Sequence, residues 1–370
     1  MKSQKPCVPF LDFTLQYEEL RTEVLSAIDE TLKASNFTLG ARVAQFEAQF
    51  ATYCRQRYAV GVNNGTSALH LALVAAGVGP GDEVITTPLT FVASVAAIEA
   101  AGATPVLADV DGRTLNIDPS AVEAAITCRT KAIMPVHLHG LMADVHALKE
   151  ISDGCGAVLI EDAAQAHGAE CQGQRSGSVG LFGSFSFYPG KNLGAYGEAG
   201  AVVTGDSEKA AQLRCLRDWG QESKSKHVMK GFNYRMDAIQ AAVLEIKLRY
   251  IEAWTESRRE IAQKYTSELK PAGIETPEEP AGYLHSYHVY ALKVPDREGL
   301  REQLSLMGIE TSIHYPTPVH LQPAYTDLGY KIGEFPESEL AAARLVSLPI
   351  FPGMTREQTE MVATAVLRAI

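Results

Sequence analysis

A lysine in a glycine-rich loop is the residue of this sequence whose surroundings point most directly to chemistry. Lys191 follows a short apolar run that ends at Ser186, and it lies among the glycines at positions 190, 194, 197 and 200. A lysine held in a bent, partly apolar loop loses solvation, so its ammonium gives up a proton more readily. A free amine at the end of a strand can form a Schiff base with a carbonyl compound. The alternative interpretation is a surface loop whose lysine is simply solvated.

A carboxylate stands in a comparable position. Asp162 follows Glu161 within the apolar run at residues 157–164 (AVLIEDAA). Two neighbouring carboxylates cannot both be buried cheaply, which favours a functional role for Asp162. A carboxylate at the end of a buried strand can keep a ring nitrogen protonated, and a protonated ring is an electron sink. The alternative is a helix-capping or salt-bridged aspartate.

A third candidate feature is the turn NNGTSAL at residues 63–69, where a strand meets a helix. Gly65 allows a tight turn, and Thr66 and Ser67 are residue types that often cap helices. Open backbone N–H groups and the positive end of the helix dipole make such a turn suitable for binding phosphate. An ordinary strand-to-helix connection is the alternative.

Apolar runs that alternate with helical segments predict how these residues meet. Strands are expected at 58–63, 83–88, 104–110, 131–138, 157–164, up to Ser186, and at 199–205, with helices near 18–34, 41–55, 66–77, 91–101, 119–126, 143–154 and 207–218. The runs are continuous rather than alternating, so the strands are expected to be covered on both faces. Strand–helix alternation at this spacing predicts an α/β fold with a mostly parallel sheet, whose sites lie at the carboxyl ends of the strands.

The strand pattern weakens after residue 231, where a long helix is expected over 231–254. We place a domain boundary near residue 250. The large domain would be 1–250, and a smaller α+β domain would be 251–370. In the smaller domain, strands are expected at 286–294 and 308–315, and helices at 297–306, 337–345 and 355–369. No GxGxxG or GxxxxGK[ST] motif occurs, which disfavours a dinucleotide fold and a P-loop.

A pyridine aldehyde phosphate bound where the strand ends converge would give each candidate residue a role. Lys191 would hold the aldehyde and later act as a base, and Asp162 would hold the ring nitrogen. Gln165 would reach the ring hydroxyl or else face solvent, and Phe91 would stack on the ring or else pack in the core. Gly65, Thr66 and Ser186 would bind the phosphate. His167 is interpreted as a satisfied buried histidine, and His137 and His139 receive no role.

The composition excludes several other classes. The chain has 370 residues, a formal charge of −11 and 46% hydrophobic residues, as expected for a globular enzyme of one large and one smaller domain. It has no apolar run that could span a membrane and no signal-peptide pattern, so we expect a cytoplasmic protein. The negative charge disfavours nucleic-acid binding. The six cysteines contain no CxxC pair and are expected to be reduced thiols, and no metal site is expected.

These motifs, in this order, resemble the DegT/StrS family of pyridoxal-phosphate sugar aminotransferases. The resemblance runs from FTLGARVAQFE (37–47) to LVSLPIFPGMT (345–355), and includes EDAAQAHGA, FSFYPGKNLGAYGEAGA and GFNYRMDAIQAA. It implies the type I aminotransferase fold and a cofactor that alternates between pyridoxal 5'-phosphate and pyridoxamine 5'-phosphate. One departure is visible: the family usually has HLYGQ where this chain has His137-Leu-His-Gly-Leu141.

The resemblance also implies partners. It predicts a homodimer with shared sites, in which Asn233 reaches the phosphate of the neighbouring subunit's cofactor and Arg235 approaches that site's substrate. His314 and Tyr315 would lie near the sugar nucleotide. Glutamate, or glutamine, would be the amino donor, and a dTDP- or UDP-linked keto-sugar the acceptor. The motif GKNLGAYGEAG is most like that of family members that aminate the C3 ketone of a nucleotide-linked sugar.

Two other functions stay open. One is different chemistry with the same cofactor, such as dehydration or lyase activity. The presence of Lys191 argues against dehydration, because dehydratases of the family have histidine at that position. The other is a regulatory protein that keeps the fold without turnover, and the intact Lys191 and Asp162 argue against it.

Overall fold

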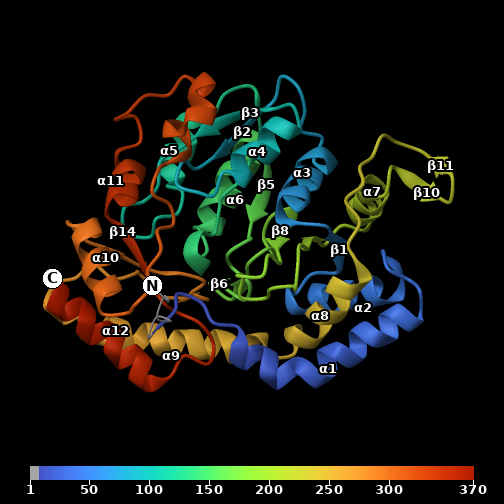
Figure 1. Ribbon diagram of the computed structural model, residues 1–370. Helices are drawn as coiled ribbons and strands as arrows, with labels where there is room; N and C mark the ends of the chain where they lie inside the picture. The colour runs from blue at the N-terminus through green and yellow to red at the C-terminus, as the bar shows by residue number, and fades with distance from the viewer. Residues whose placement is uncertain (1–7) are drawn as a thin grey trace.

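A seven-stranded sheet forms the centre of the molecule (Figure 1). The computed structural model describes residues 8–370. The strand order is β1-β9-β8-β5-β4-β2-β3, with β1 at Tyr58–Val62, β2 at Glu83–Thr86, β3 at Thr104–Leu107, β4 at Thr130–Ile133, β5 at Val158–Asp162, β8 at Phe182–Ser186 and β9 at Gly200–Thr204. In this sheet β9 is antiparallel to both neighbours, and the remaining adjacent pairs are parallel. The expected mostly parallel mixed sheet is therefore confirmed.

Helices cover both faces of this sheet, because its strands are apolar on both sides. One face packs against α3 (Gly65–Ala75), α4 (Ala93–Ala100) and α7 (Ser207–Arg217). The other packs against α5 (Pro119–Ala125) and α6 (Val145–Cys155) at one end, and α2 (Gly40–Tyr53) and α8 (Ala238–Leu248) at the other. The long helix α1 (Thr14–Lys33) lies across α8 on the outside.

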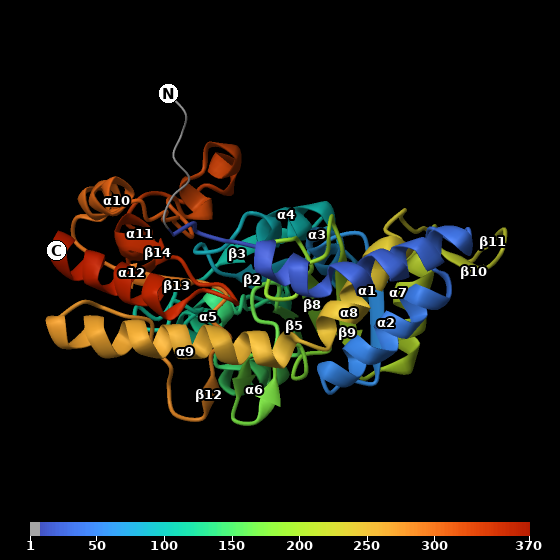
Figure 2. The ribbon, with the colours of Figure 1, turned by 60° about the horizontal axis from the view of Figure 1, so that its bottom comes forward.

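The C-terminal part is built around α9 (Ile251–Leu269) and α12 (Arg356–Ala369), which lie side by side (Figures 1 and 2). Together with α10 (Arg297–Leu306), they pack against a two-stranded sheet of β13 (Tyr290–Lys293) and β14 (Leu345–Leu348). Helix α11 (Pro336–Arg344) packs against the same strands in a separate apolar cluster. Val8, from the opposite end of the chain, packs into the same apolar cluster. The division into domains at residue 250 stays a proposal.

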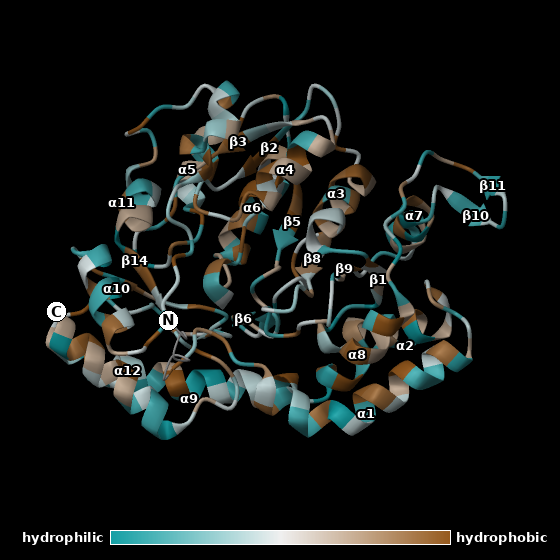
Figure 3. Ribbon diagram, in the orientation of Figure 1, coloured by the Kyte–Doolittle hydropathy of each residue, from teal (hydrophilic) through white to brown (hydrophobic). Residues whose placement is uncertain are grey.

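The smaller elements join the two parts and extend outward. Strands β6 (Glu170–Cys171), β7 (Gln174–Arg175) and β12 (Tyr283–Leu284) form a three-stranded sheet, and β10 (Gln221–Ser223) pairs with β11 (Lys226–His227). Short 3-10 turns occupy Leu138–Gly140, Lys270–Ala272, Val319–Leu321 and Pro323–Leu328. The β10–β11 hairpin is mainly hydrophilic and projects from the body, whereas α3 and α4 are mainly hydrophobic (Figure 3).

Three expectations about local structure are wrong. Residues 308–315 form no strand and make only isolated bridges, such as that between Ser312 and Ser347. Residues 231–237 are not helical: Asn233 and Arg235 bridge to other segments before α8 begins. Helix α3 is capped by the side chain of Asn64, which accepts from the Ser67 amide, rather than by Thr66 or Ser67. In each case the local sequence allows more than one conformation or hydrogen-bond partner, and tertiary contacts decide which one forms.

Candidate active site

Asp162 lies at the carboxyl end of β5 and is 3% exposed. Its Oδ2 atom accepts a 2.7 Å hydrogen bond from the Ser94 hydroxyl, and Oδ1 accepts a 3.2 Å bond from the Ala164 amide. Burial raises the pKa of this carboxyl above its ordinary value, although these hydrogen bonds and the charge of Lys191 act in the opposite direction. A carboxylate with few donors in a buried place can still accept from a ligand, because each oxygen has two lone pairs.

Glu161, the preceding residue, is completely buried as well. Both neighbouring carboxyl groups are therefore buried, and Glu161 is the one whose burial the surrounding donors offset. The Glu161 carboxylate accepts 2.8 Å hydrogen bonds from the amides of Gly177, Val179 and Gly180, and it pairs with His137 Nε2 at 2.8 Å. Burial alone would raise its pKa, but these partners, led by His137, hold it below the ordinary value.

Lys191 lies in the loop after β8, between Gly190 and Asn192. Within residues 8–370, no hydrogen-bond or salt-bridge partner is found for its amine. Burial lowers the pKa of Lys191 to about 8, and the nearby Asp162 charge limits that decrease. More of this amine is therefore deprotonated near neutral pH than of an ordinary lysine, as a nucleophilic amine requires.

Three buried histidines lie within electrostatic reach of the amine. His167, His288 and His314 each feel the charge of Lys191, and burial is the first cause of the lowered pKa of each. The pKa is about 3 for His167 and about 3 for His314. His167 lies beside Phe185 and Phe187 and, contrary to expectation, neither of its ring nitrogens meets hydrogen-bond geometry with any described residue. The lowered pKa values keep these histidines neutral near pH 7.

The turn after β1 lies beside the end of β8. A Cβ atom added to Gly65 would come within 2.6 Å of the Ser186 Cβ and 3.1 Å of its hydroxyl oxygen, so a larger residue would fill this place. In the described part of the chain no oxygen accepts from the amides of Gly65 and Thr66, because helix α3 starts there and Asn64 serves the amide of Ser67. Two amides and one hydroxyl therefore converge, as an anion such as phosphate requires.

Gln165 and Tyr315 connect the sheet to the C-terminal part. The Gln165 Nε2 donates to the Tyr315 hydroxyl at 3.0 Å, and its Oε1 accepts from the His139 amide at 2.8 Å. The Tyr315 ring lies 5.9 Å from that of Phe91, which is 55% exposed and free to cover a flat ligand. His139 Nε2 donates to the main-chain oxygen of His314 at 2.9 Å, so the position that departs from the family pattern holds this segment.

Asn233 and Arg235 lie elsewhere, beside β1 and after α7. Arg235 contacts Asp218 at 3.3 Å and the Asn233 side chain at 3.0 Å, and bridges to Val62. Neither residue makes a described contact with Lys191 or Asp162. Their predicted roles in a neighbouring subunit's site stay predictions.

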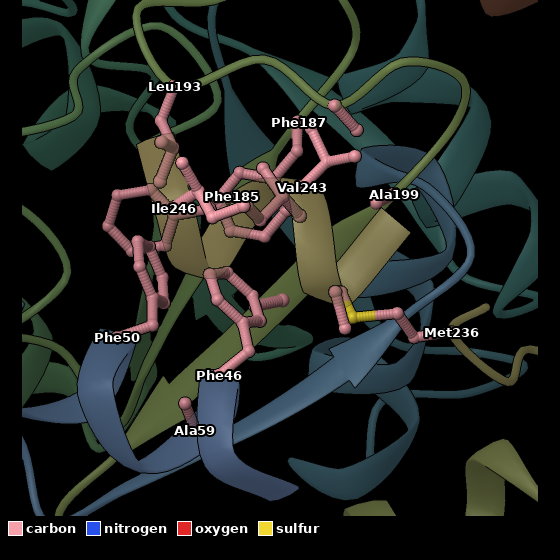
Figure 4. Packing of buried hydrophobic residues seen from close by; sticks show 14 of the residues in the cluster. Phe46, Phe50, Ala59, Phe185, Phe187, Leu193, Ala199, Met236, Val243 and Ile246 are labelled. Carbon is pink, nitrogen blue, oxygen red and sulfur yellow. The ribbon is translucent and has the colours of Figure 1, made fainter. Parts of the chain in front are cut away.

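The loop that carries Lys191 packs on a buried apolar cluster that includes Phe46, Phe50, Phe185 and Phe187 (Figure 4). Leu193 inserts into this cluster near Phe187, and both are fully buried. The buried amine of Lys247 on α8 donates to Gly194 O at 2.7 Å, and burial lowers the pKa of Lys247 to about 8. The contacts of Leu193 and Lys247 therefore fix the loop and hold Lys191 at the edge of the sheet.

The donor set fits a pyridine aldehyde phosphate. The amine of Lys191 suits its aldehyde, the carboxylate of Asp162 its ring nitrogen, and the amides after Asn64 its phosphate. Residues 8–370 contain no group of three or more histidine, cysteine, aspartate or glutamate side chains placed to hold a metal ion. Within the same residues, no helix is both long enough and apolar enough to cross a membrane.

Sequence reasoning missed several residues of this site. Ser94 and Thr90 contact Asp162 directly or through each other, and His288 lies beside Lys191. Ser94 follows Phe91 by three residues at the start of a helix, so its spacing in the sequence could have indicated that it lies near the same site. His288 offered none, because only the tertiary fold brings residue 288 to residue 191.

The whole arrangement matches a known family. The model of the DegT/DnrJ/EryC1/StrS aminotransferase family matches residues 18–367. The chain belongs to that family. Among relatives of this aminotransferase, a Streptomyces venezuelae dTDP-3-amino-3,4,6-trideoxy-alpha-D-glucose transaminase is 46% identical over 99% of this chain and 97% of its own. A protein of Geobacillus stearothermophilus named as a pleiotropic regulatory protein is 47% identical over 96% of both chains.

Solved structures agree. The crystal structure of S. venezuelae DesV in complex with a ketimine intermediate has a TM-score of 0.96, 46% identity, and coverage of 99% of this chain and 98% of its own. NtdA from Bacillus subtilis, solved with bound cofactor PMP, has a TM-score of 0.91 and 30% identity, covering 100% of this chain and 86% of its own. This aminotransferase has the fold of pyridoxal-phosphate enzymes and depends on that cofactor.

Proposed function

We propose that this aminotransferase transfers an amino group from glutamate to a nucleotide-linked keto-sugar, with pyridoxal phosphate held between Lys191 and Asp162. The observation that carries the proposal is the unpartnered amine of Lys191 beside the buried carboxylate of Asp162, at strand ends that also form an anion-binding turn. When bound, the cofactor supplies an electron sink for chemistry at the amine-bearing carbon.

Binding and orientation fall to residues around the sheet edge. Gly65, Thr66 and Ser186 would hold the phosphate through two amides and a hydroxyl. Asp162 would hold the ring nitrogen, and Gln165 would turn its amide toward the ring hydroxyl. Phe91 would cover one ring face, and its exposure leaves room for that contact.

Proton movement falls to Lys191. Its pKa of about 8 gives both a protonated and a free population near neutral pH, so Nζ can take a proton from one carbon and return it to another. The neighbouring histidines, kept neutral by burial, neither repel the ammonium nor compete as charged acids. The lysine is thus the one group beside Asp162 suited to shuttle a proton.

We further propose that the acceptor is a dTDP- or UDP-linked 3-keto sugar and that the product enters amino-sugar biosynthesis. The name of the Streptomyces relative supports an acceptor of this class. His314 and Tyr315 would contact the sugar nucleotide, since they lie beside Phe91 and Gln165. Arg235 would approach the substrate with its guanidinium, which suits a diphosphate.

A homodimer in the cytoplasm completes the proposal. Asn233 and Arg235 lie away from Lys191 of their own subunit, so a second copy is needed if they serve a site. Several apolar side chains of α1 and the following segment are exposed, among them Leu25, Leu32 and Phe37, which supports a covered face. Sedimentation analysis of the purified protein would test the dimer.

The decisive experiment locates the cofactor and then follows the amino group. Borohydride treatment of the loaded protein, followed by peptide mass spectrometry, should place the cofactor on Lys191, and Lys191→Ala should abolish that adduct. Wild-type protein should release 2-oxoglutarate from glutamate alone, and then aminate members of a panel of dTDP- and UDP-linked 3-keto sugars. An adduct on another lysine would refute the assignment of Lys191.

A regulatory role is the second candidate, because one relative carries a regulatory name. The intact amine, carboxylate and anion-binding turn argue against a protein without turnover. Absence of amino transfer across the panel, with the cofactor still bound at Lys191, would favour regulation. Loss of water from the sugar without amination would instead favour dehydratase or lyase chemistry.

A further inference from the structure

A chain of two hydroxyl groups leads to the carboxylate of Asp162. Ser94, near the start of α4, is 1% exposed and donates from Oγ to Asp162 Oδ2 at 2.7 Å. Thr90 Oγ1 lies 2.9 Å from the same Ser94 oxygen and is also buried. The chain is closed off from solvent, so its hydrogen bonds are stronger than exposed ones.

The ionised carboxylate fixes the direction of both bonds. A carboxylate only accepts, so the Ser94 proton must point to Asp162. With its own proton used, the Ser94 oxygen accepts from Thr90. If Asp162 becomes protonated on Oδ2, that proton needs an acceptor and the two hydroxyls must reorient; if it becomes protonated on Oδ1, the proton meets the Ala164 amide. The arrangement Thr90 to Ser94 to Asp162 therefore stabilises the charged form of the carboxylate over the neutral form.

Little else in the protein supports that charge by hydrogen bonding. Apart from Ser94, the described donor to the Asp162 carboxylate is the amide of Ala164 at 3.2 Å. The titratable groups that act on it are Lys191 after β8, His137 after β4 and Tyr315 in the C-terminal part. Burial raises the pKa of Asp162 in spite of them, so the loss of Ser94 would raise it further.

We propose that Ser94, supported by Thr90, is a positioning residue that keeps the Asp162 carboxylate ionised and oriented for the ring nitrogen of the cofactor. The inference rests on the proposed function and deepens it. The same turn of chain also carries Phe91, whose carbonyl accepts from the Ser94 amide at 3.2 Å. The start of α4 thus places both Phe91, which would cover the ring face, and the Ser94 hydroxyl, which orients Asp162 toward the ring nitrogen.

The first test uses the protein without cofactor, where activity plays no part. Ser94→Ala, Thr90→Val and a control, Ser184→Ala, are each compared with the same variant carrying Asp162→Asn. Ser184 is a matched control because it is a buried serine paired with Asp162 in the sheet, with no hydrogen-bond partner for its hydroxyl among the described residues. The pH dependence of the stability difference within each pair reports the pKa of Asp162.

We expect Ser94→Ala to raise that pKa by roughly one unit, Thr90→Val by less, and Ser184→Ala not at all. Affinity for pyridoxamine 5'-phosphate, measured by fluorescence titration over a range of pH, should fall about tenfold in Ser94→Ala at the acid end and less at the alkaline end, where the carboxyl is ionised in both proteins. Ser94→Thr, which keeps the hydroxyl, should restore most of the affinity. A purely structural role would not give a loss that depends on pH.

Equal behaviour of Ser94→Ala and Ser184→Ala in both measurements would overturn the inference. If Ser94→Ala does not fold, Thr90→Val decides, and an unchanged Asp162 pKa in that variant would overturn it as well. Failure of the proposed function looks different, since wild-type protein would then show no cofactor adduct on Lys191, whatever the serine variants do.

Discussion

Two adjacent carboxyl groups on β5 are both buried, and yet their pKa values are shifted in opposite directions. Glu161 points to one face of the sheet, where three amides and His137 surround it, and its pKa lies below the ordinary value. Asp162 points to the other face, where Ser94 and one amide contact it, and its pKa is raised. A carboxylate that the protein satisfies is structural, whereas one left short of donors is available to a ligand.

His137 is one of the hydrogen-bond donors that surround the Glu161 carboxylate. His137 Nδ1 accepts from the Ala143 amide at 3.2 Å, so its ring proton is on Nε2 and points to Glu161. The pair therefore links the segment after β4 to β5 and to the turn at residues 177–180. No comparable pair exists for Asp162 among the described residues, which leaves its charge free to face the site.

The largest effect should come from Asp162→Asn. An amide cannot hold a protonated ring nitrogen by charge, so kcat/KM for amino transfer should fall by about 100- to 1000-fold. The unfolding free energy of the cofactor-free protein should stay equal or rise, because a poorly satisfied buried charge is removed. Steady-state kinetics and urea unfolding measure the two. Asp153→Asn, on the exposed side of α6, serves as the control.

The neighbouring change, Glu161→Gln, should affect stability instead. The Gln amide oxygen could still accept some of the four hydrogen bonds that Glu161 accepts, but the negative charge would be gone. We therefore expect the free energy of unfolding to fall by about 3 kcal/mol. Urea unfolding measures it, with Glu123→Gln on exposed α5 as the control. The kcat of the folded fraction should stay near that of wild type. A fall in kcat as large as that of Asp162→Asn would contradict the division of roles.

The smallest expected effect is the pH dependence of these stability differences without cofactor. For Glu161 the pKa is depressed in the folded state, so its contribution is present above the unfolded value of about 4.3 and is lost as the pH falls through the folded value. For Asp162 the pKa is raised, so its contribution is full below about 3.9 and is lost as the pH rises through the folded value. Urea unfolding from acid to neutral pH measures the difference in unfolding free energy between wild type and Glu161→Gln, and between wild type and Asp162→Asn. These two differences should change with pH in opposite directions.

The fold was largely predictable because its strands are continuous apolar runs separated by helices. The expected strand ends at Asn63, Ala164 and Ser186 match the observed ends of β1, β5 and β8 within two residues. The direction of β9 was less visible, because an apolar run does not encode whether its neighbour is parallel. Residues 308–315 were read as a strand since their composition suits one, but nearby segments offer only single bridges.

By itself, the sequence determined that an amine, a carboxylate and an open helix start lie at the ends of strands in one sheet. Residue type and strand period are local properties, so they can be read from the chain. Only the tertiary structure decided which of Glu161 and Asp162 is left short of donors. That distinction depends on partners from distant segments, namely His137, the turn at 177–180 and Ser94, and electrostatics inside a protein is set by what packs around a group.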